Sequence, residues 1–285
     1  MHKKFSLSSL KMPTTLTINS IKTLKEFTNF IEKQLPLSKD SILWFRGSGR
    51  TTYTLSPSIH RHATISAPDK IIELEVKLMD RFNQRSVPFL QKPLDKKNDW
   101  EVLFFMQHYG IPTRLLDWSE NPFIALYFAL TSAPFKVVHK KREYEEDACI
   151  WVLDPVAWNQ ESLKDFSYNN GILSVEDHFV NSFKPRTPFE NIREKPIGIF
   201  GTHNSARIVS QRGVFTVFGK NLKSIEATYV DESFPQDCLI QLLLPKEKIL
   251  SLLNSLTSLG ITDSVVYPDL EGLAKEVRRF FKFDL

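Results

Sequence analysis

The spacing of apolar residues predicts helices along much of the chain. Thr23 and Glu26 form a capping box, and the apolar stripe behind them ends at Pro36. Further stretches repeat apolar residues every three or four positions, as expected for helices with one buried face. Helices are therefore predicted at residues 23–36, 68–87, 100–109, 121–131, 246–256 and 270–281.

Short apolar runs between these helices predict strands. Helices and strands follow each other without a regular β-α-β alternation, which favours an α+β fold over a doubly wound sheet. We expect a single globular unit at residues 39–285, with a mixed sheet of short strands flanked by helices, behind an arm and helix at residues 1–38. The predicted strands are residues 41–46, 113–117, 148–153, 197–200, 214–218, 239–244 and 265–267.

Three segments show neither pattern clearly. Residues 1–15 are expected to form a loose arm or a short first element. Residues 136–147 carry a run of basic and then acidic side chains, which is typical of a solvated loop or hairpin tip. Residues 162–188 give few signals, so a helical insertion and a lid both stay open.

Composition and charge narrow the function only a little. The 285 residues are 42% hydrophobic and 25% charged, which is ordinary for a globular protein. The net charge of +4 permits a phosphate-bearing ligand or RNA without requiring one. We find no apolar run of transmembrane length and no signal peptide, so we expect a cytoplasmic protein that does not bind membranes.

The cysteines and the missing motifs exclude several classes of protein. Cys149 and Cys238 lie in separate apolar runs without a CxxC partner, so they are predicted to be buried thiols. The seven histidines show no metal-ligand spacing, and we predict no metal site. The sequence lacks the phosphate-binding, dinucleotide-binding, zinc-protease and serine-hydrolase motifs GxxxxGK[ST], GxGxxG, HExxH and GxSxG.

Arg46 is the first candidate site residue. It ends an apolar strand, where an arginine is costly to bury unless it is paired. One interpretation is an ion pair with a structural carboxylate, and the other is an anion clamp, since the planar guanidinium fits phosphate. Gly47 permits the close approach of a ligand or of another backbone segment.

Residues 107–119 are the second candidate, because they are dense in groups that donate, accept or titrate. A helix is expected to end near Gly110, which places His108 in its last turn, where the helix dipole favours the protonated imidazole. Along the following strand, alternation places Asp117 on the face opposite Leu116 and Trp118. Asp117 by itself is also explained as a helix cap or as a partner for an arginine.

Two later segments give weaker candidates. Gln211 and Gly213 mark a turn into an apolar strand, which a simple hairpin also explains. Asp269 is well placed as the N-cap of the last helix. Glu271, in the first turn of that helix, is a reserve candidate for a catalytic carboxylate.

Four segments together resemble the FRG domain, a bacterial family named for a Phe-Arg-Gly motif. They are WFRG at 44–47, QHYGIPTRLLDWSENPFIALYFA at 107–129, ARIVSQRGVFTVFG at 206–219 and YPDLEGLA at 267–274. The resemblance extends from about residue 40 to nearly the end of the chain. The block at 107–129 is long and specific.

The order of these motifs is also similar to that of ADP-ribosyltransferases, and this weaker resemblance implies NAD as the substrate. It matches Arg46 to the arginine or histidine of a first core strand, and Ser119 to a Ser/Thr-rich strand that leads into a helix. Gly213 stands where a catalytic glutamate is expected, so Asp117, Gln211 or Glu271 would have to replace it. Tyr109, Trp118 and Tyr127 are candidates for stacking on nicotinamide. The residues implied in catalysis are Arg46, Asp117, Ser119, Gln211 and Glu271, and those implied in NAD binding are Arg46, Gly47, His108, Tyr109, Thr113, Arg114, Trp118 and Asn121.

Three functions follow as hypotheses. The first is an NAD-dependent ADP-ribosyltransferase that modifies RNA, DNA or protein, as a toxin or phage-defence effector with an antitoxin or regulator as partner. The second is a sensor that binds a nucleotide or phosphate ligand without turnover, which Gly213 favours. The third is a nuclease that uses His108, Arg114 and Asp117 as acid, phosphate clamp and orienting group, independently of NAD.

Overall fold

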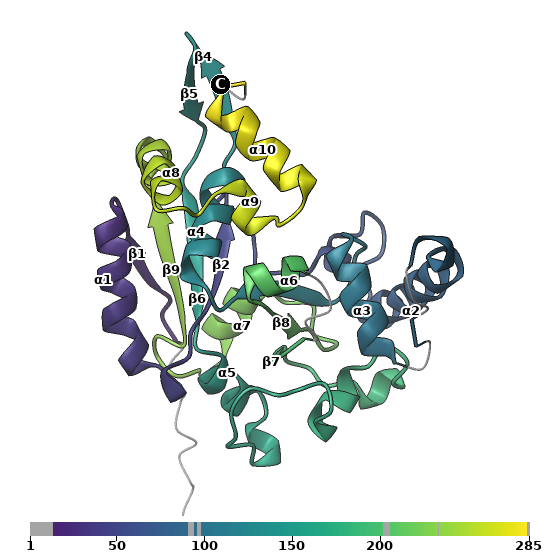
Figure 1. Ribbon diagram of the computed structural model, residues 1–285. Coiled ribbons are helices and arrows are strands. Elements are labelled where there is room, and N and C mark those ends of the chain that lie inside the picture. Colours follow the sequence, from purple (N-terminus) through teal and green to yellow (C-terminus); the bar gives the residue numbers. More distant parts are fainter. Residues whose placement is uncertain (1–13, 91–93, 96–97, 202–205, 233, 284–285) are drawn as a thin grey trace, which may run out of the picture.

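The computed structural model describes residues 14–90, 94–95, 98–201, 206–232 and 234–283, and it shows an α+β fold with one large mixed sheet (Figure 1). Within the described residues, this sheet has seven strands in the order β1-β9-β6-β2-β3-β8-β7. Neighbouring strands are antiparallel except β1 and β9, which are parallel. The strands are β1 Thr17–Ser20, β2 Trp44–Ser48, β3 Leu115–Ser119, β6 Ala148–Leu153, β7 Ile197–Ile199, β8 Gly213–Val217 and β9 Leu239–Leu244. The predicted fold class is therefore confirmed.

Helices bury both faces of this sheet. Along β6, alternate side chains enter two different apolar clusters, as the two-residue period of a strand requires, so all six residues are buried. One cluster joins the sheet to α1, α4, α8 and α9, and the other joins it to α5 and α7. A third cluster packs α2 and α3 over β7 and β8. The helices are α1 Leu24–Gln34, α2 Pro68–Arg85, α3 Asp99–His108, α4 Pro122–Thr131, α5 Pro155–Ser162, α6 Ala206–Gln211, α7 Ile225–Asp231, α8 Ile249–Ser258, α9 Asp263–Val266 and α10 Leu270–Phe280.

Helix α4 lies unusually close to β2, and this contact explains two glycines. A Cβ atom on Gly47 would lie 1.9 Å from the carbonyl oxygen of Ala125, and one on Gly49 would lie 2.2 Å from that of Ser132. Any side chain at either position would collide with the helix backbone. Gly47 thus permits the approach of another backbone segment, which was one of the two possibilities in the sequence.

A buried ion pair joins α2 to the start of β3. The main-chain N–H of Arg114 donates to Glu75 Oε1 and its Nε–H donates to Oε2, both at 2.7 Å. The other two guanidinium nitrogens donate to the carbonyl oxygens of Phe218 and Phe183. Both charged side chains are fully buried, and these bonds compensate for their lost hydration.

The structure differs from the sequence predictions in several elements. Residues 265–267 were expected as a strand, which is wrong: they belong to helix α9 and the turn after it, because an apolar run of two or three residues defines no period. The strand expected from residue 113 begins at Leu115, since the Thr113 hydroxyl accepts a hydrogen bond from Leu115 N–H and makes a turn first. Strand β1 was not expected, and residues 1–13 lie outside the described residues.

The strand expected at residues 41–46 begins only at Trp44, and other predictions of this kind agree with the structure. Residues 136–147 lie in the hairpin of β4 (Phe135–Val138) and β5 (Lys141–Tyr144). Cys149 and Cys238 are buried and unbridged. The weakly patterned segment at 162–188 contains short 3-10 helices. The 3-10 helices are Leu35–Leu37, Lys39–Ser41, Ser58–Arg61, Val87–Phe89, Lys164–Phe166, His178–Phe183, Phe189–Asn191 and Lys246–Lys248. Within the described residues, no helix combines the length and apolar character needed to span a bilayer.

Candidate functional site

A cavity of about 280 Å³ opens where strands β2 and β3 part from each other. In the described part of the chain these neighbours pair at one position only, Phe45 with Ser119, whereas β2 and β6 pair at five. The separation leaves polar groups of both strands facing open space. Side chains from α3, α4 and α6 enclose that space. Its lining residues are Phe45, Arg46, Gly47, Phe104, Gln107, His108, Asp117, Trp118, Ser119, Ala125, Phe128, Ser132, Arg207, Ile208, Gln211, Gly213 and Phe215.

Arg46 crosses the gap between the two strands. Its Nη1 donates a hydrogen bond of 2.5 Å to the main-chain carbonyl oxygen of Asp117, and no carboxylate among the described residues forms an ion pair with it. Burial lowers the pKa of Arg46, the charge of Asp117 opposes that shift, and the charge of Arg61 adds to it. The guanidinium stays charged in every case, because its ordinary pKa is far above neutrality. Arg46 is therefore a fixed cation with donors left for an anion.

A short chain of hydrogen bonds holds the Asp117 carboxylate in the cavity, on the same side as Arg46. Gln107 Nε2 donates to Asp117 Oδ2 at 2.6 Å, and the Thr113 hydroxyl donates to Gln107 Oε1 at 2.6 Å. Thr113 is fully buried and outside the cavity lining, so it acts through Gln107. This chain fixes the Gln107 amide and the orientation of the carboxylate.

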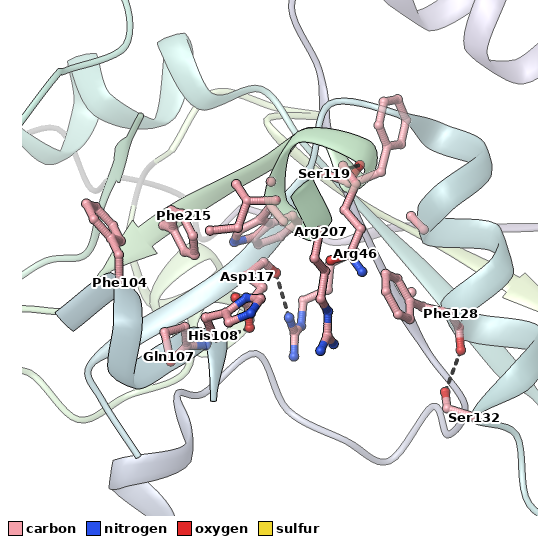
Figure 2. Close-up of a pocket in the computed structure, with 17 residues that line it drawn as sticks. Arg46, Phe104, Gln107, His108, Asp117, Ser119, Phe128, Ser132, Arg207 and Phe215 are labelled. Carbon is pink, nitrogen blue, oxygen red and sulfur yellow. Dashed lines mark hydrogen bonds between the residues drawn. The ribbon is translucent and has the colours of Figure 1, made fainter. Parts of the chain in front are cut away.

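Arg207 supplies a second cation, which sequence reasoning did not select. It lies on the short helix α6, whose end is attached to α9: Gln211 Nε2 donates to the carbonyl oxygen of Val266 at 3.1 Å. The guanidinium carbon of Arg207 lies 4.7 Å from the centre of the Tyr267 ring. Arg207 has no ion-pair partner within the described residues. Figure 2 shows Arg46 and Arg207 extending into the same space, with Asp117 and His108 beside them.

His108 lies in the last turn of α3, as predicted, but its proton affinity runs against the prediction. Burial lowers the pKa of His108, and the charge of Arg207 lowers it further, while Asp117 opposes both. The expected preference for the protonated imidazole is therefore wrong, because desolvation and a neighbouring cation outweigh the helix end. At neutral pH the ring is neutral and has a nitrogen that can accept a proton.

Ser119 and Asn121 build the turn between β3 and α4. The Ser119 hydroxyl donates to the carbonyl oxygen of Gln211 at 2.6 Å and accepts from Asn121 N–H at 2.9 Å. Asn121 caps α4, since its side-chain oxygen accepts from Phe123 N–H. Ser119 lines the cavity, but its hydroxyl is already committed to these bonds, so it positions the wall of the site.

Several other candidate residues lie away from the cavity. Arg114 is in the interior with Glu75, and Glu271 is exposed on α10, where it pairs with Lys275 at 2.8 Å. Tyr109 is 65% exposed and outside the lining. The sequence-predicted catalytic and binding residues that line the cavity are Arg46, Gly47, His108, Asp117, Ser119 and Gln211, together with Trp118, whose indole points away from it.

The aromatic rings in the cavity are phenylalanines. The indole of Trp118 packs in the core on the opposite face of the sheet and donates to Thr216 Oγ1 at 3.1 Å, while Tyr127 is buried against Asp263. Tyr109, Trp118 and Tyr127 were expected to stack on nicotinamide, but none of their rings projects into the cavity. Four phenylalanines are among the lining residues: Phe128 is partly exposed, whereas Phe45, Phe104 and Phe215 are buried core residues at the cavity wall.

These groups define the chemistry that the site can perform. Two guanidiniums can bind an anion such as phosphate, the partly exposed ring of Phe128 can pack against a flat apolar ring, and a carboxylate and a neutral imidazole can interact with a developing positive charge or a proton. The described residues contain no cluster of three His, Cys, Asp or Glu side chains placed to hold a metal ion. The site is therefore suited to a phosphorylated ligand that carries a ring.

The class of the protein is thus an α+β fold with a cationic, phenylalanine-lined cavity at a split in its sheet. Residues 41–136 match the model of the FRG domain family. No curated protein and no solved structure matches the chain. The matched segment contains Arg46, His108 and Asp117, whereas Arg207 and Gln211 lie beyond it. The comparisons support the FRG resemblance over this segment and give no support to the resemblance to ADP-ribosyltransferases.

Proposed function

We propose that the protein binds NAD in the Arg46 cavity and transfers ADP-ribose to a macromolecule. The observation that supports this is the strand order β2-β3-β8, which places the three segments with motif resemblance side by side. Ser119 pairs with Phe45 on one side and with Gly213 on the other. Arg46, Ser119 and Gly213 therefore meet at one cavity, although 167 positions separate the first from the last.

In this proposal each charged side chain has a distinct task. Arg46 and Arg207 bind the pyrophosphate of NAD, and a phenylalanine ring packs against nicotinamide. The bond between ribose C1′ and the nicotinamide nitrogen breaks, and nicotinamide leaves with the electron pair. Asp117 stabilises the positive charge that develops on the ribose. A nucleophilic atom of the acceptor bonds to C1′, and its proton passes to the neutral imidazole of His108.

Asp117 is the carboxylate that this arrangement favours for the role left vacant at Gly213. Asp117 and Ser119 point to the same face of β3, because they are two residues apart in a strand. Gly213 lies opposite Ser119, so Asp117 is one step along the same face from the position where the resemblance expects a glutamate. Glu271 is exposed on α10 and outside the cavity lining, which makes it unsuitable.

The test is to incubate the protein with labelled NAD and total RNA or cell lysate. We expect label transfer and release of nicotinamide by the wild type. Arg46→Ala should weaken binding of NAD by about 10- to 100-fold, as for the loss of a charged hydrogen bond of about 1.5–3 kcal/mol. Asp117→Asn should retain binding and lose transfer. Arg81→Ala, which changes an exposed arginine of α2, is the matched control.

The absence of both NAD binding and NAD consumption would refute the proposal. If the chain is a toxin or phage-defence effector, its expression should also stop growth, and Arg46→Ala should relieve that toxicity. Growth that is unaffected by the wild type would exclude the effector role while leaving the enzymatic assay to decide the activity.

A nucleotide sensor without turnover is a second candidate, and Gly213 is the observation that favours it. Calorimetry with NAD and ADP-ribose would then show binding without conversion. A Cβ atom at position 213 would lie 3.4 Å from Ile208 Cγ2, which is an ordinary contact, and position 213 lines the cavity, so Gly213→Glu is the variant to test. Transfer that appears only in Gly213→Glu would identify the wild type as the sensor. The nuclease hypothesis loses its phosphate clamp, because Arg114 is buried away from His108 and Asp117.

A further inference from the structure

We propose that a second, basic groove of the protein binds single-stranded nucleic acid. The groove has a volume of about 530 Å³ and lies between the β4–β5 hairpin, α8 and the C-terminal end of α10. These elements converge at the top of Figure 1. The groove and the Arg46 cavity share no lining residue, so the inference does not depend on NAD binding or turnover.

The charge of the groove is one-sided. Five of its nine lining residues are cationic, and none is acidic, in a chain whose overall net charge is only +4. A cleft lined by one sign of charge concentrates the opposite charge within it. The lining residues are Lys140, Lys141, Arg142, Leu250, Leu253, Asn254, Thr257, Arg279 and Lys282.

The three lysines of the groove are available to a ligand. Lys140 and Lys141 lie at the hairpin tip and Lys282 follows α10, and none of them has an ion-pair partner within the described residues. Arg279, in contrast, is fixed in the wall, because its Nε and Nη2 donate to the two carboxylate oxygens of Asp263 at 2.8 and 3.0 Å. The groove thus has a fixed arginine at α10 and exposed ammonium groups that can contact successive phosphates.

Exposed aromatic rings stand beside these cations. The end of α10 and the turn after it read Arg-Arg-Phe-Phe-Lys-Phe at residues 278–283. Phe280, Phe281 and Phe283 are 79, 66 and 76% exposed, which is costly for phenylalanine in water. A basic groove next to exposed rings is the arrangement by which proteins bind single strands, since phosphates contact the cations and unpaired bases stack on the rings.

The shape of this surface favours a polymer chain over a membrane. The cations line a concave groove with Asn254 and Thr257 among them, and the side-chain amide of Asn254 can donate hydrogen bonds to phosphate or sugar oxygens. A flat bilayer cannot enter a groove, whereas a single strand can lie along it. Stacking requires unpaired bases, so a duplex should bind less well.

The experiment measures fluorescence anisotropy of a labelled, mixed-sequence 20-nucleotide RNA, the corresponding single-stranded DNA and an RNA duplex, all without NAD. The groove variant is Lys140→Gln, Lys141→Gln and Lys282→Gln combined. The control is Lys77→Gln, Arg81→Gln and Arg85→Gln on α2, which removes the same charge from an exposed surface far from the groove in Figure 1. A third variant replaces Phe280 and Phe281 by Ser. Circular dichroism and thermal melting of each variant establish that it is folded.

We expect the wild type to bind the single strands, with affinity that falls steeply as salt rises. The groove variant should bind at least about tenfold more weakly than the control and should flatten the slope of log K against log salt by about 2, since three phosphate contacts are lost. The phenylalanine variant should weaken binding by about tenfold or more with an unchanged salt slope.

The inference is overturned if neither single strand binds at 50 mM salt, if the groove and control variants lose affinity equally, or if the duplex binds as tightly as the single strands. Binding to vesicles of anionic phospholipid without binding to nucleic acid would also overturn it. Failure of the labelled-NAD assay alone leaves the anisotropy result standing, so the two proposals are tested separately.

Discussion

His108 and Arg207 line the same cavity, and the charge of the arginine acts on the proton of the imidazole. The two residues lie far apart in sequence. They share a cavity because α6 leads into β8, α3 leads towards β3, and these two strands pair. The combination of a neutral ring and a nearby cation suits a proton acceptor beside a bound anion. A phosphate between the two side chains would neutralise part of the arginine charge.

Replacing Arg207 by Gln should raise the pKa of His108. Burial would still lower the pKa, but the repulsion from the guanidinium would be absent. NMR titration of the His108 ring protons measures this value in both proteins. His139→Asn removes a histidine at the exposed hairpin turn. This variant helps to assign the histidine signals and is the control, because it leaves the cavity unchanged. An unchanged or lowered pKa of His108 in Arg207→Gln would show that the arginine does not act on it.

At the scale of elements, the close contact between β2 and α4 fixes one wall of the site. Gly47 allows that contact, and α4 then contributes Phe128 and Ser132 to the cavity. The glycine of the WFRG motif therefore has a packing role, while the arginine beside it lines the cavity. One motif thus combines a structural role with a proposed binding role.

Gly47→Ala should destabilise the protein and weaken ligand binding together. The added methyl group would lie 1.9 Å from the Ala125 carbonyl oxygen, so α4 must move, at a cost of about 1–3 kcal/mol or more. Urea denaturation and NAD calorimetry measure the two effects. Gly213→Ala is the control, because its methyl group would make an ordinary contact with Ile208. Equal stability of the two variants would contradict the packing role.

At the scale of the whole molecule, local patterns were enough for some features and not for others. The alternation along 115–119 correctly placed Asp117 on the face opposite Leu116 and Trp118. Successive side chains of a strand point to opposite faces, and the two apolar residues mark the buried face. Arg207 was missed because its position depends on a strand pairing that joins residues almost a hundred positions apart. Arg114 looked like a site residue because its partner Glu75 lies in helix α2, far from it in sequence, and sequence spacing does not reveal that contact.

The whole chain should lose stability in mild acid through His60. Burial and the charge of Arg114 lower the pKa of His60 to about 4, from an ordinary value of 6.5. Below pH 6.5 the unfolded chain gains a proton that the folded protein takes up only near pH 4, so stability falls across that window, by up to about 3 kcal/mol. Denaturation of His60→Phe at pH 7 and pH 4.5 should show a smaller difference than the wild type. An equal difference in both proteins would exclude His60 as a source.

The origin of the cavity walls sets a limit on how this protein can be divided. Strand β3 is flanked by β2 from within residues 41–136 and by β8 from outside them, and one of the two cavity arginines comes from each part. A fragment cut at the ends of the family match would expose an unpaired edge of β3 and carry half of the anion clamp. The segment that matches the FRG model is therefore not a portable module, and grafting it onto another protein should not transfer the pocket.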